Sequence, residues 1–460
     1  MSAAGLPSPA DLAERLLGAA TRPCIAIVED THEADVRFAN NTVTTDGVRA
    51  DRRVTVVLVD APDAPGAPGR AGIARRSGDV DVDALVREAA AATAPAEDAA
   101  PLVEGDADEG FGDDAVLTGL DRLAPVVGGL AGAFRRAEAA GAVLSGFVEH
   151  SVTTTYLASS SGLRRRHVQP TGALQLVGRR DGASAWAGVG GAEVGDGELG
   201  SLEEAVRRGL GWSARHVDVP PGRHEVILPP SAVADLMMFL AEAASGRDAE
   251  DGRTVFSRPG GGTRVGEQLT PLPFDLWSDP EEAGLECAPF LATSISTADV
   301  SVFDNGLPLG RTPWLAAGRL GRLRYHRAGA RRSGAPAAAP IDNLALALPG
   351  ASGSVDDLVA ATERGLLLTC LWYIREVDPK TLLLTGLTRD GVYVVEDGKV
   401  VGAAGNFRFN ESPLDVLARA TQVSSTVRTY GREGGSWMNR TAMPALRVPD
   451  WNMSSPSQAV

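Results

Sequence analysis

The chain opens with apolar residues at helical spacing. Leu12, Leu16 and Leu17 recur on one side of a helix. They follow Ser8-Pro9, a serine suited to an N-cap and a proline suited to the first helical turn. The pattern predicts a helix at this point.

The pattern then changes to short β-branched runs. Residues 24–28 and 54–59 predict strands, and residues 36–44 alternate around Asn40-Asn41, a pair that favours a hairpin turn. An alanine-rich segment over 81–94 predicts a helix that stops at Pro95. The strands indicate a small antiparallel sheet.

A helix followed by strands appears a second time. A helix is predicted over 123–140, with strands at 142–148, 153–158 and 172–178. Ser201-Leu202-Glu203-Glu204 has the form of a capping box, which predicts the start of a helix that ends near Gly211. The order of elements therefore indicates a loose α+β repeat.

Strand patterns dominate from Glu225 onward. The clearest hairpin joins 392–395 to 399–401 through Glu396-Asp397-Gly398. Two helices interrupt the strands, with N-caps at Ser354 and Ser412. The C-terminal half is therefore predicted to be mainly β.

These patterns predict an α+β protein with an antiparallel sheet in its N-terminal part and a mainly β C-terminal domain. We expect an N-terminal α+β domain over 1–96, an acidic linker or loop over 97–118, a central α+β domain over 119–218, a mainly β domain over 219–450 and a frayed tail over 451–460.

Charge and hydropathy restrict the partners. The 460 residues carry 44 basic and 59 acidic side chains, a net charge of −15 that would repel a phosphate backbone. No apolar stretch approaches the roughly 18 residues of a membrane-spanning helix, and the first residues lack a leader pattern. We therefore expect a cytoplasmic protein that binds neither nucleic acid nor membrane.

Metal ligands are sparse. Cys24, Cys287 and Cys370 lie far apart, as expected for reduced thiols, and no two histidines have the spacing that places two imidazoles on one helix face. His224-Glu225 and His32-Glu33 are isolated His-Glu pairs. The sequence predicts no catalytic zinc site within this chain.

Three other segments superficially suggest functional loops. Arg258-Pro259-Gly260-Gly261-Gly262-Thr263 lacks the Gly-Lys-Ser/Thr ending of a phosphate loop, and Gly188-Val189-Gly190-Gly191 is an incomplete dinucleotide motif better interpreted as a β-turn. Ser354 follows a glycine-rich run but is better used as a helix N-cap than as a nucleophile.

An ordered series of segments in the C-terminal half resembles the TldD/PmbA metalloprotease family. The segments are 299–308, Gly318-Arg319-Leu320, 365–369, 385–389, 391–399 and 429–434. Phe38-Ala39-Asn40-Asn41 and Ser159-Ser160-Ser161-Gly162-Leu163 extend the resemblance to the N-terminal half. The resemblance implies a C-terminal domain of the TldD/PmbA type.

The chain departs from the zinc-bearing members of that family at two places. Those members carry HExxxH on a helix and a cysteine ligand near the C-terminus; here the corresponding helix, 231–242, has apolar side chains at the ligand positions, and Tyr430 stands where the thiolate would be. The sequence is thus similar to the TldE/PmbA type, which lacks the zinc motif.

The resemblance implies a non-catalytic subunit of a heteromeric protease. We expect this chain to be inactive alone and to pair with a TldD-like subunit that carries zinc, enclosing an unfolded peptide substrate. Asp304, Arg389 and Tyr430 are the residues expected to line the substrate chamber. Alternatives are an independent hydrolase with an unrecognised site and a peptide-binding scaffold in a biosynthetic pathway.

Overall fold

The computed structural model describes residues 7–60 and 69–457 and confirms the α+β class. Its N-terminal part is one antiparallel seven-stranded sheet in the order β4-β3-β2-β1-β5-β6-β7. The strands are β1 (Cys24–Ala39), β2 (Thr42–Asp60), β3 (Gly69–Ser77), β4 (Ala94–Ala96), β5 (Val143–Ser159), β6 (Arg164–Arg180) and β7 (Ala183–Gly191). Strands from 1–96 and from 119–218 thus share a single sheet.

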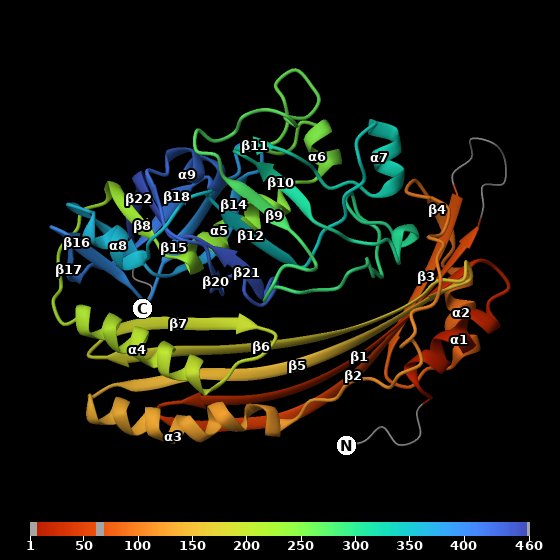
Figure 1. The fold of residues 1–460 in the computed structure, drawn as a ribbon, viewed down its shortest axis with the longest axis horizontal. Coiled ribbons are helices and arrows are strands. Elements are labelled where there is room, and N and C mark those ends of the chain that lie inside the picture. The colour runs from red at the N-terminus through yellow and green to blue at the C-terminus, as the bar shows by residue number, and fades with distance from the viewer. Residues whose placement is uncertain (1–6, 61–68, 458–460) are drawn as a thin grey trace.

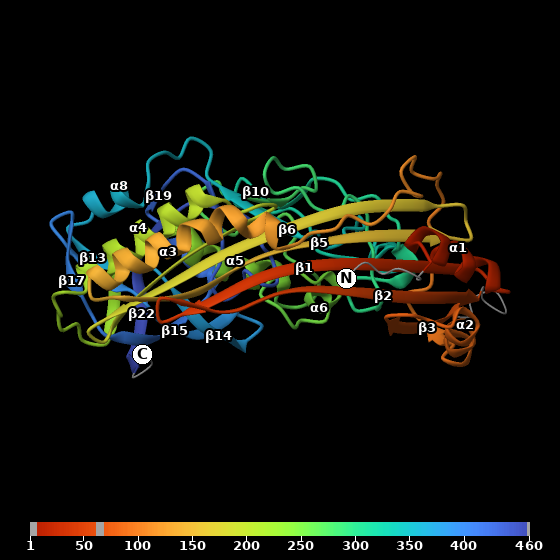
Figure 2. The same ribbon diagram turned by 90° about the horizontal axis from the view of Figure 1, so that it is seen from below.

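Helices cover one face of this sheet (Figures 1 and 2). They are α1 (Pro9–Ala19), α2 (Val82–Ala91), η1 (Leu120–Leu123), α3 (Ala124–Ala139) and α4 (Asp196–Trp212). The Ser8 side chain caps α1 as predicted by accepting a hydrogen bond from the Asp11 N–H. Two apolar clusters fill the space between helices and sheet, so the opposite face is free to meet the C-terminal part.

The C-terminal part lies over that opposite face (Figure 1). One of its sheets comprises β8 (Gly222–Leu228), β13 (Arg364–Leu368), β14 (Leu371–Asp378), β15 (Leu383–Thr388), β16 (Val392–Glu396), β17 (Lys399–Ala403), β18 (Asn406–Glu411), β19 (Gln422–Val423) and β22 (Leu446–Ser457). The other comprises β9 (Asp275–Ser278), β10 (Thr312–Ala316), β11 (Arg319–Leu320), β12 (Asn343–Ala347), β20 (Val427–Thr429) and β21 (Arg440–Met443).

Helix α5 (Pro230–Glu242) is the central helix of the C-terminal part. It contacts β8 of the first sheet and β20 and β21 of the second. It is apolar around almost its whole circumference, as a helix buried on all sides must be. The other helices are α6 (Gly246–Glu250), η2 (Val302–Asp304), α7 (Arg327–Ser333), α8 (Val355–Ala360) and α9 (Pro413–Arg419).

Local turn and cap signals predicted several elements correctly. Asn40 and Asn41 both have positive φ, and so do Asp397 and Gly398, which confirms both hairpin turns. Ser354 caps α8 with a capping box completed by Asp357. Among the described residues, no helix is long and apolar enough to cross a membrane.

Three sequence-based expectations are wrong. Ser201 lies inside α4, which begins five residues earlier after Gly195, because Glu198 completes a cap there. Residues 188–191 are the end of strand β7, paired with β6, and not a turn. The predicted frayed tail continues as strand β22 to Ser457, because its backbone pairs with β18 and Trp451 is fully buried; residues 458–460 lie outside the described part.

Candidate functional site

The helix and the C-terminal segment singled out by the sequence meet in the structure. Asp235, on α5, is 1% exposed. Its Oδ1 accepts hydrogen bonds from the N–H groups of Glu433 and Gly434, each at 3.0 Å, and its Oδ2 accepts one from Arg432 at 3.2 Å. One carboxylate therefore holds the turn that follows β20.

Glycines in this turn allow the close approach. A Cβ added to Gly434 would lie 2.0 Å from Cε of Met238, and one added to Gly431 would lie 2.5 Å from Oδ1 of Asp235. Asp235 and Met238 are three residues apart on one helix face. This face of α5 is thus fitted to the backbone of residues 431–434.

Burial raises the pKa of Asp235 to about 7, and the nearby carboxylate of Glu433 acts in the same direction. The three backbone N–H groups oppose the shift because they stabilise the charged form. Asp235 thus titrates close to neutral pH.

Arg432 extends from the same turn into the boundary between the two parts of the molecule. Its guanidinium lies 5.3 Å from the ring centroid of Trp186 on β7 and 5.1 Å from that of Trp372 on β14. It also forms an ion pair with Asp390, which is 2% exposed, and Arg389 Nε lies 3.6 Å from the same carboxylate oxygen. Stacking between two indoles and a buried ion pair fix the arginine.

Tyr430 packs against β7 from the other side of the turn. Its side chain is 2% exposed, and its hydroxyl accepts a hydrogen bond from Gln175 Nε2 at 3.0 Å. A Cβ added to Gly190 would lie 2.5 Å from its ring, so the glycines of β7 make room for the tyrosine. The glycine run of β7 therefore serves the packing of this strand against Tyr430.

Glu433 covers the edge of the nine-stranded sheet. Its carboxylate accepts hydrogen bonds from the N–H groups of Tyr373 at 2.9 Å and Ile374 at 3.2 Å, both on β14. Since β14 is the last strand of its sheet, these donors would otherwise be open to a further strand. Tyr373 has a φ of 54° and a side chain 58% exposed beside this edge.

Two of the three predicted chamber residues belong to this cluster. Arg389 and Arg432 both approach the Asp390 carboxylate, and Tyr430 lies two residues before Arg432 in the same segment. Asp304 lies elsewhere: it is 2% exposed and accepts hydrogen bonds from the backbone and side chain of Arg327, at the start of α7. Asp304 therefore anchors α7.

The sequence patterns do not single out Asp235, Arg432 or Asp390. Asp235 is the single charged residue inside the apolar stretch of α5 from Ala232 to Leu240, and that was the available signal. Asp390 has a φ of 48°, a backbone strain that sequence does not reveal.

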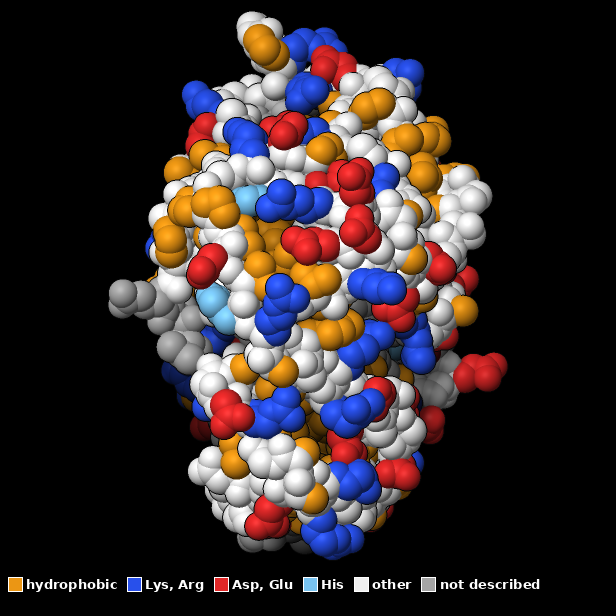
Figure 3. Space-filling model, turned by 90° about the vertical axis from the view of Figure 1, so that its left-hand side faces the viewer, with side chains coloured by type: hydrophobic (Ala, Val, Ile, Leu, Met, Phe, Trp, Pro, Cys, Tyr) orange, Lys and Arg blue, Asp and Glu red, His pale blue; other side chains and the backbone are white. Residues whose placement is uncertain are grey.

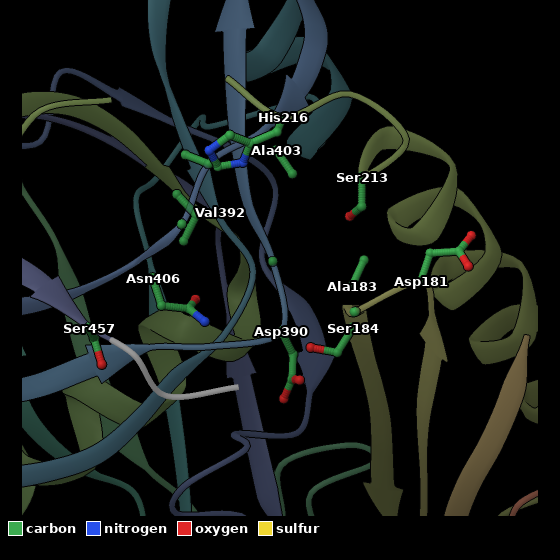
Figure 4. Close-up of a pocket in the computed structure, with 14 residues that line it drawn as sticks. Asp181, Ala183, Ser184, Ser213, His216, Asp390, Val392, Ala403, Asn406 and Ser457 are labelled. Atoms are coloured by element: carbon green, nitrogen blue, oxygen red, sulfur yellow. The ribbon is translucent and has the colours of Figure 1, made fainter. Parts of the chain in front are cut away.

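A polar cavity of about 410 Å³ adjoins the cluster (Figure 4). Asp390 and Asn406 from the C-terminal part line it, and so do Asp181 from the turn between β6 and β7 and Ser184 from the start of β7. Ser213, at the end of α4, completes the boundary. On this end of the molecule, acidic and basic side chains are interspersed (Figure 3).

The donor groups at the two expected zinc positions do not fit a zinc ion. Both oxygens of Asp235 are engaged by backbone N–H groups, Met238 offers only a thioether, and the Tyr430 hydroxyl is bound by Gln175. Across residues 7–60 and 69–457, no group of three His, Cys, Asp or Glu side chains could hold a metal.

The thiols are not poised for nucleophilic chemistry. Cys24, Cys287 and Cys370 are all buried. Burial raises the pKa of Cys24 and of Cys287 to about 12, and it raises that of Cys370 as well. All three are therefore held as neutral thiols at physiological pH.

Solved structures share this fold along almost the whole chain. TldE from Thermococcus kodakarensis superimposes with a TM-score of 0.76 at 17% identity, over 96% of this chain and 98% of that one. A proposed modulator of a DNA gyrase from Thermotoga maritima gives 0.72 at 16% identity, over 96% and 99%. A similar protein from Bacteroides thetaiotaomicron gives 0.69 at 13% identity, over 97% and 98%.

Sequence comparison identifies the family to which the chain belongs. No curated protein matches the chain. The sequence profile of the PmbA/TldA metallopeptidase C-terminal domain matches residues 221–455. Since this match spans more than half of the chain, the protein belongs to the PmbA/TldA metallopeptidase family.

Proposed function

We propose that this chain is the zinc-free, TldE/PmbA-type subunit of a heteromeric metalloprotease and that it encloses peptide substrate for a TldD-like, zinc-bearing partner. The supporting observation is the contact between α5 and the turn after β20. At the two places where the family's metal ligands are expected, Asp235 binds three backbone N–H groups and Tyr430 packs on β7.

The proposed roles of the two subunits follow from the chemical groups that each contains. The partner supplies zinc-bound water and the glutamate base, which the groups around Asp235 do not replace. This chain contributes walls and peptide contacts. We propose a cytoplasmic complex, in keeping with three buried, unpaired cysteines.

The inner face of the seven-stranded sheet suits peptide binding between its ends. Cross-strand rows on this face carry Glu33 beside Ser151 and Asp35 beside Glu149. Apolar contacts close the face at one end around Leu157 and Phe303 and at the other around Trp186 and Tyr430. Between the two closures the sheet presents hydroxyl and carboxylate groups.

The test is assembly with the HExxxH-bearing homologue from the same genome. We expect size-exclusion chromatography with light scattering to show a mixed complex, with zinc bound in proportion to the partner subunit alone. A chain that stays separate at micromolar concentrations, or that binds one zinc per chain by itself, would contradict the proposal.

A further inference from the structure

A second cavity, of about 310 Å³, lies between the inner face of the seven-stranded sheet and loops of the C-terminal part. Its floor is one row across three strands, because Glu29 pairs with Thr155 and Thr155 pairs with His167. Its other wall includes Phe290, Leu309 and Asp342. The volume is at the lower end of the range for small-ligand sites.

The charge inside the cavity is acidic. Glu29 and Asp342 are the charged side chains among its described lining residues, and burial lowers the pKa of His167, which keeps the imidazole neutral. Arg53 approaches Glu29 to 3.7 Å but does not line the cavity. The cavity therefore presents carboxylates without a cation of its own.

Asp342 is the more notable of the two carboxylates. Within the described residues it makes no side-chain hydrogen bond and no ion pair, although its side chain is open to the cavity. Arg440, whose charge lowers the pKa of Asp342, donates its hydrogen bonds to the carbonyls of Glu286 and Pro170 and to the Thr171 hydroxyl. The Asp342 side chain is exposed to the cavity and the surrounding protein raises its pKa, so a cation from outside can reach the carboxylate and favour its charged form.

The apolar wall determines the shape of the preferred ligand. Phe290 is 4% exposed, and with Leu291 and Leu309 it forms a surface opposite the threonines of β5. A long basic side chain combines an aliphatic stem, which packs on such a surface, with a cationic head that reaches carboxylates. A short cation would leave the apolar wall uncovered.

We propose that this cavity binds an arginine or lysine side chain of the peptide substrate, with the cationic head between Glu29 and Asp342 and the stem against Phe290 and Leu309. The inference rests on the proposed peptide-holding function and adds a substrate preference to it. Thr153 and Thr155 offer hydroxyl acceptors beside the head.

The test uses the full chain alone, without zinc or partner. Ala-Arg-Ala and Ala-citrulline-Ala, both with blocked ends, differ in charge but hardly in shape, and their binding is measured by isothermal titration or ligand-observed NMR. We expect the arginine peptide to bind at least tenfold more tightly. Asp342→Asn and Glu29→Gln should each weaken its binding at least fivefold, whereas Glu204→Gln, on the exposed face of α4, should leave it unchanged.

Equal binding of the two peptides, no saturable binding of the arginine peptide, or full affinity in Asp342→Asn would overturn the inference. If Asp342→Asn does not fold, the arginine and citrulline comparison on the unaltered chain decides the matter. Failure of complex formation would instead strike at the proposed function, because the peptide measurement needs no partner.

Discussion

Asp235 illustrates how one buried carboxylate can organise a distant turn. Its oxygens accept hydrogen bonds from three N–H groups about 200 residues away in the chain, of which the Gly434 donor is buried and the other two are partly buried. Removing the acceptors costs more than the hydrogen bonds themselves contribute, because buried donors are then left without partners.

Asp235→Ala is therefore expected to lower the free energy of unfolding by at least about 3 kcal/mol, since each unsatisfied buried group costs about 1–3 kcal/mol. Urea unfolding followed by tryptophan fluorescence measures this. Glu204→Ala, which breaks an exposed pair with Arg207, is the control and should change stability by less than about 0.5 kcal/mol. Equal effects of both substitutions would show that the contact is not structural.

The raised pKa of Asp235 also predicts a pH dependence. Its folded-state pKa of about 7 lies above its ordinary value of 3.8, so the folded chain binds more protons than the unfolded chain between these values. The contribution of this group to stability is complete below pH 4 and falls as pH rises towards 7. The melting temperature is measured from pH 4.5 to 7.5. Its decline with rising pH should have a smaller slope in Asp235→Asn than in the unaltered chain, because asparagine does not titrate. An unchanged slope in the variant would refute it.

At the scale of elements, glycines and aromatic rings join β7 to the turn after β20. Gly190 leaves room for the ring of Tyr430, while Trp186 of β7 stacks on Arg432. Both contacts connect the seven-stranded sheet to the C-terminal part, so damage to either should loosen β7 before it affects the helices on the far face.

Gly190→Ala should place its Cβ against the Tyr430 ring and cost about 1–3 kcal/mol, the usual range for overpacking. Gly47→Ala is a matched control, because it also lies in a strand and its Cβ would meet nothing within 4 Å. Hydrogen exchange should quicken in β7 for the first variant only. Equal protection of β7 in both variants would rule out this packing role.

Elements with local signals could be predicted from the sequence, and those that depend on distant partners could not. The Asn40-Asn41 turn and the Ser354 cap depend on adjacent residues. The 16 residues of β1 are not predicted as one strand because residues 29–33 are polar on both faces: Glu29, Thr31 and Glu33 face the inner side, while Asp30 and His32 interrupt the apolar row that faces the helices. Strand β22 is fixed by pairing with β18 and β8.

The same distinction between local signals and distant partners applies to the candidate site. Resemblance located α5 and the turn near Tyr430, but nothing local in the sequence indicates that Asp235 reaches residues 432–434. Asp304 was grouped with Arg389 by motif order alone, and its ion pair with Arg327 belongs to a different region.

At the scale of the whole molecule, the chain is a long sheet with helices on one face and a C-terminal part on the other (Figure 1). The inner face is closed by apolar contacts at both ends and polar between them. Such an architecture is suited to holding a peptide, while the groups around Asp235 are suited to holding the fold. The proposed function assigns the hydrolytic chemistry to a partner subunit.

Hydrolysis of an unstructured peptide is the decisive measurement for this assignment. It is followed by mass spectrometry for this chain, for the HExxxH-bearing homologue and for their mixture, each in the presence of zinc. We expect no turnover by this chain alone, turnover by the mixture above that of the homologue alone, and loss of turnover when the glutamate of the homologue's HExxxH is replaced by glutamine. Turnover by this chain alone would contradict the assignment.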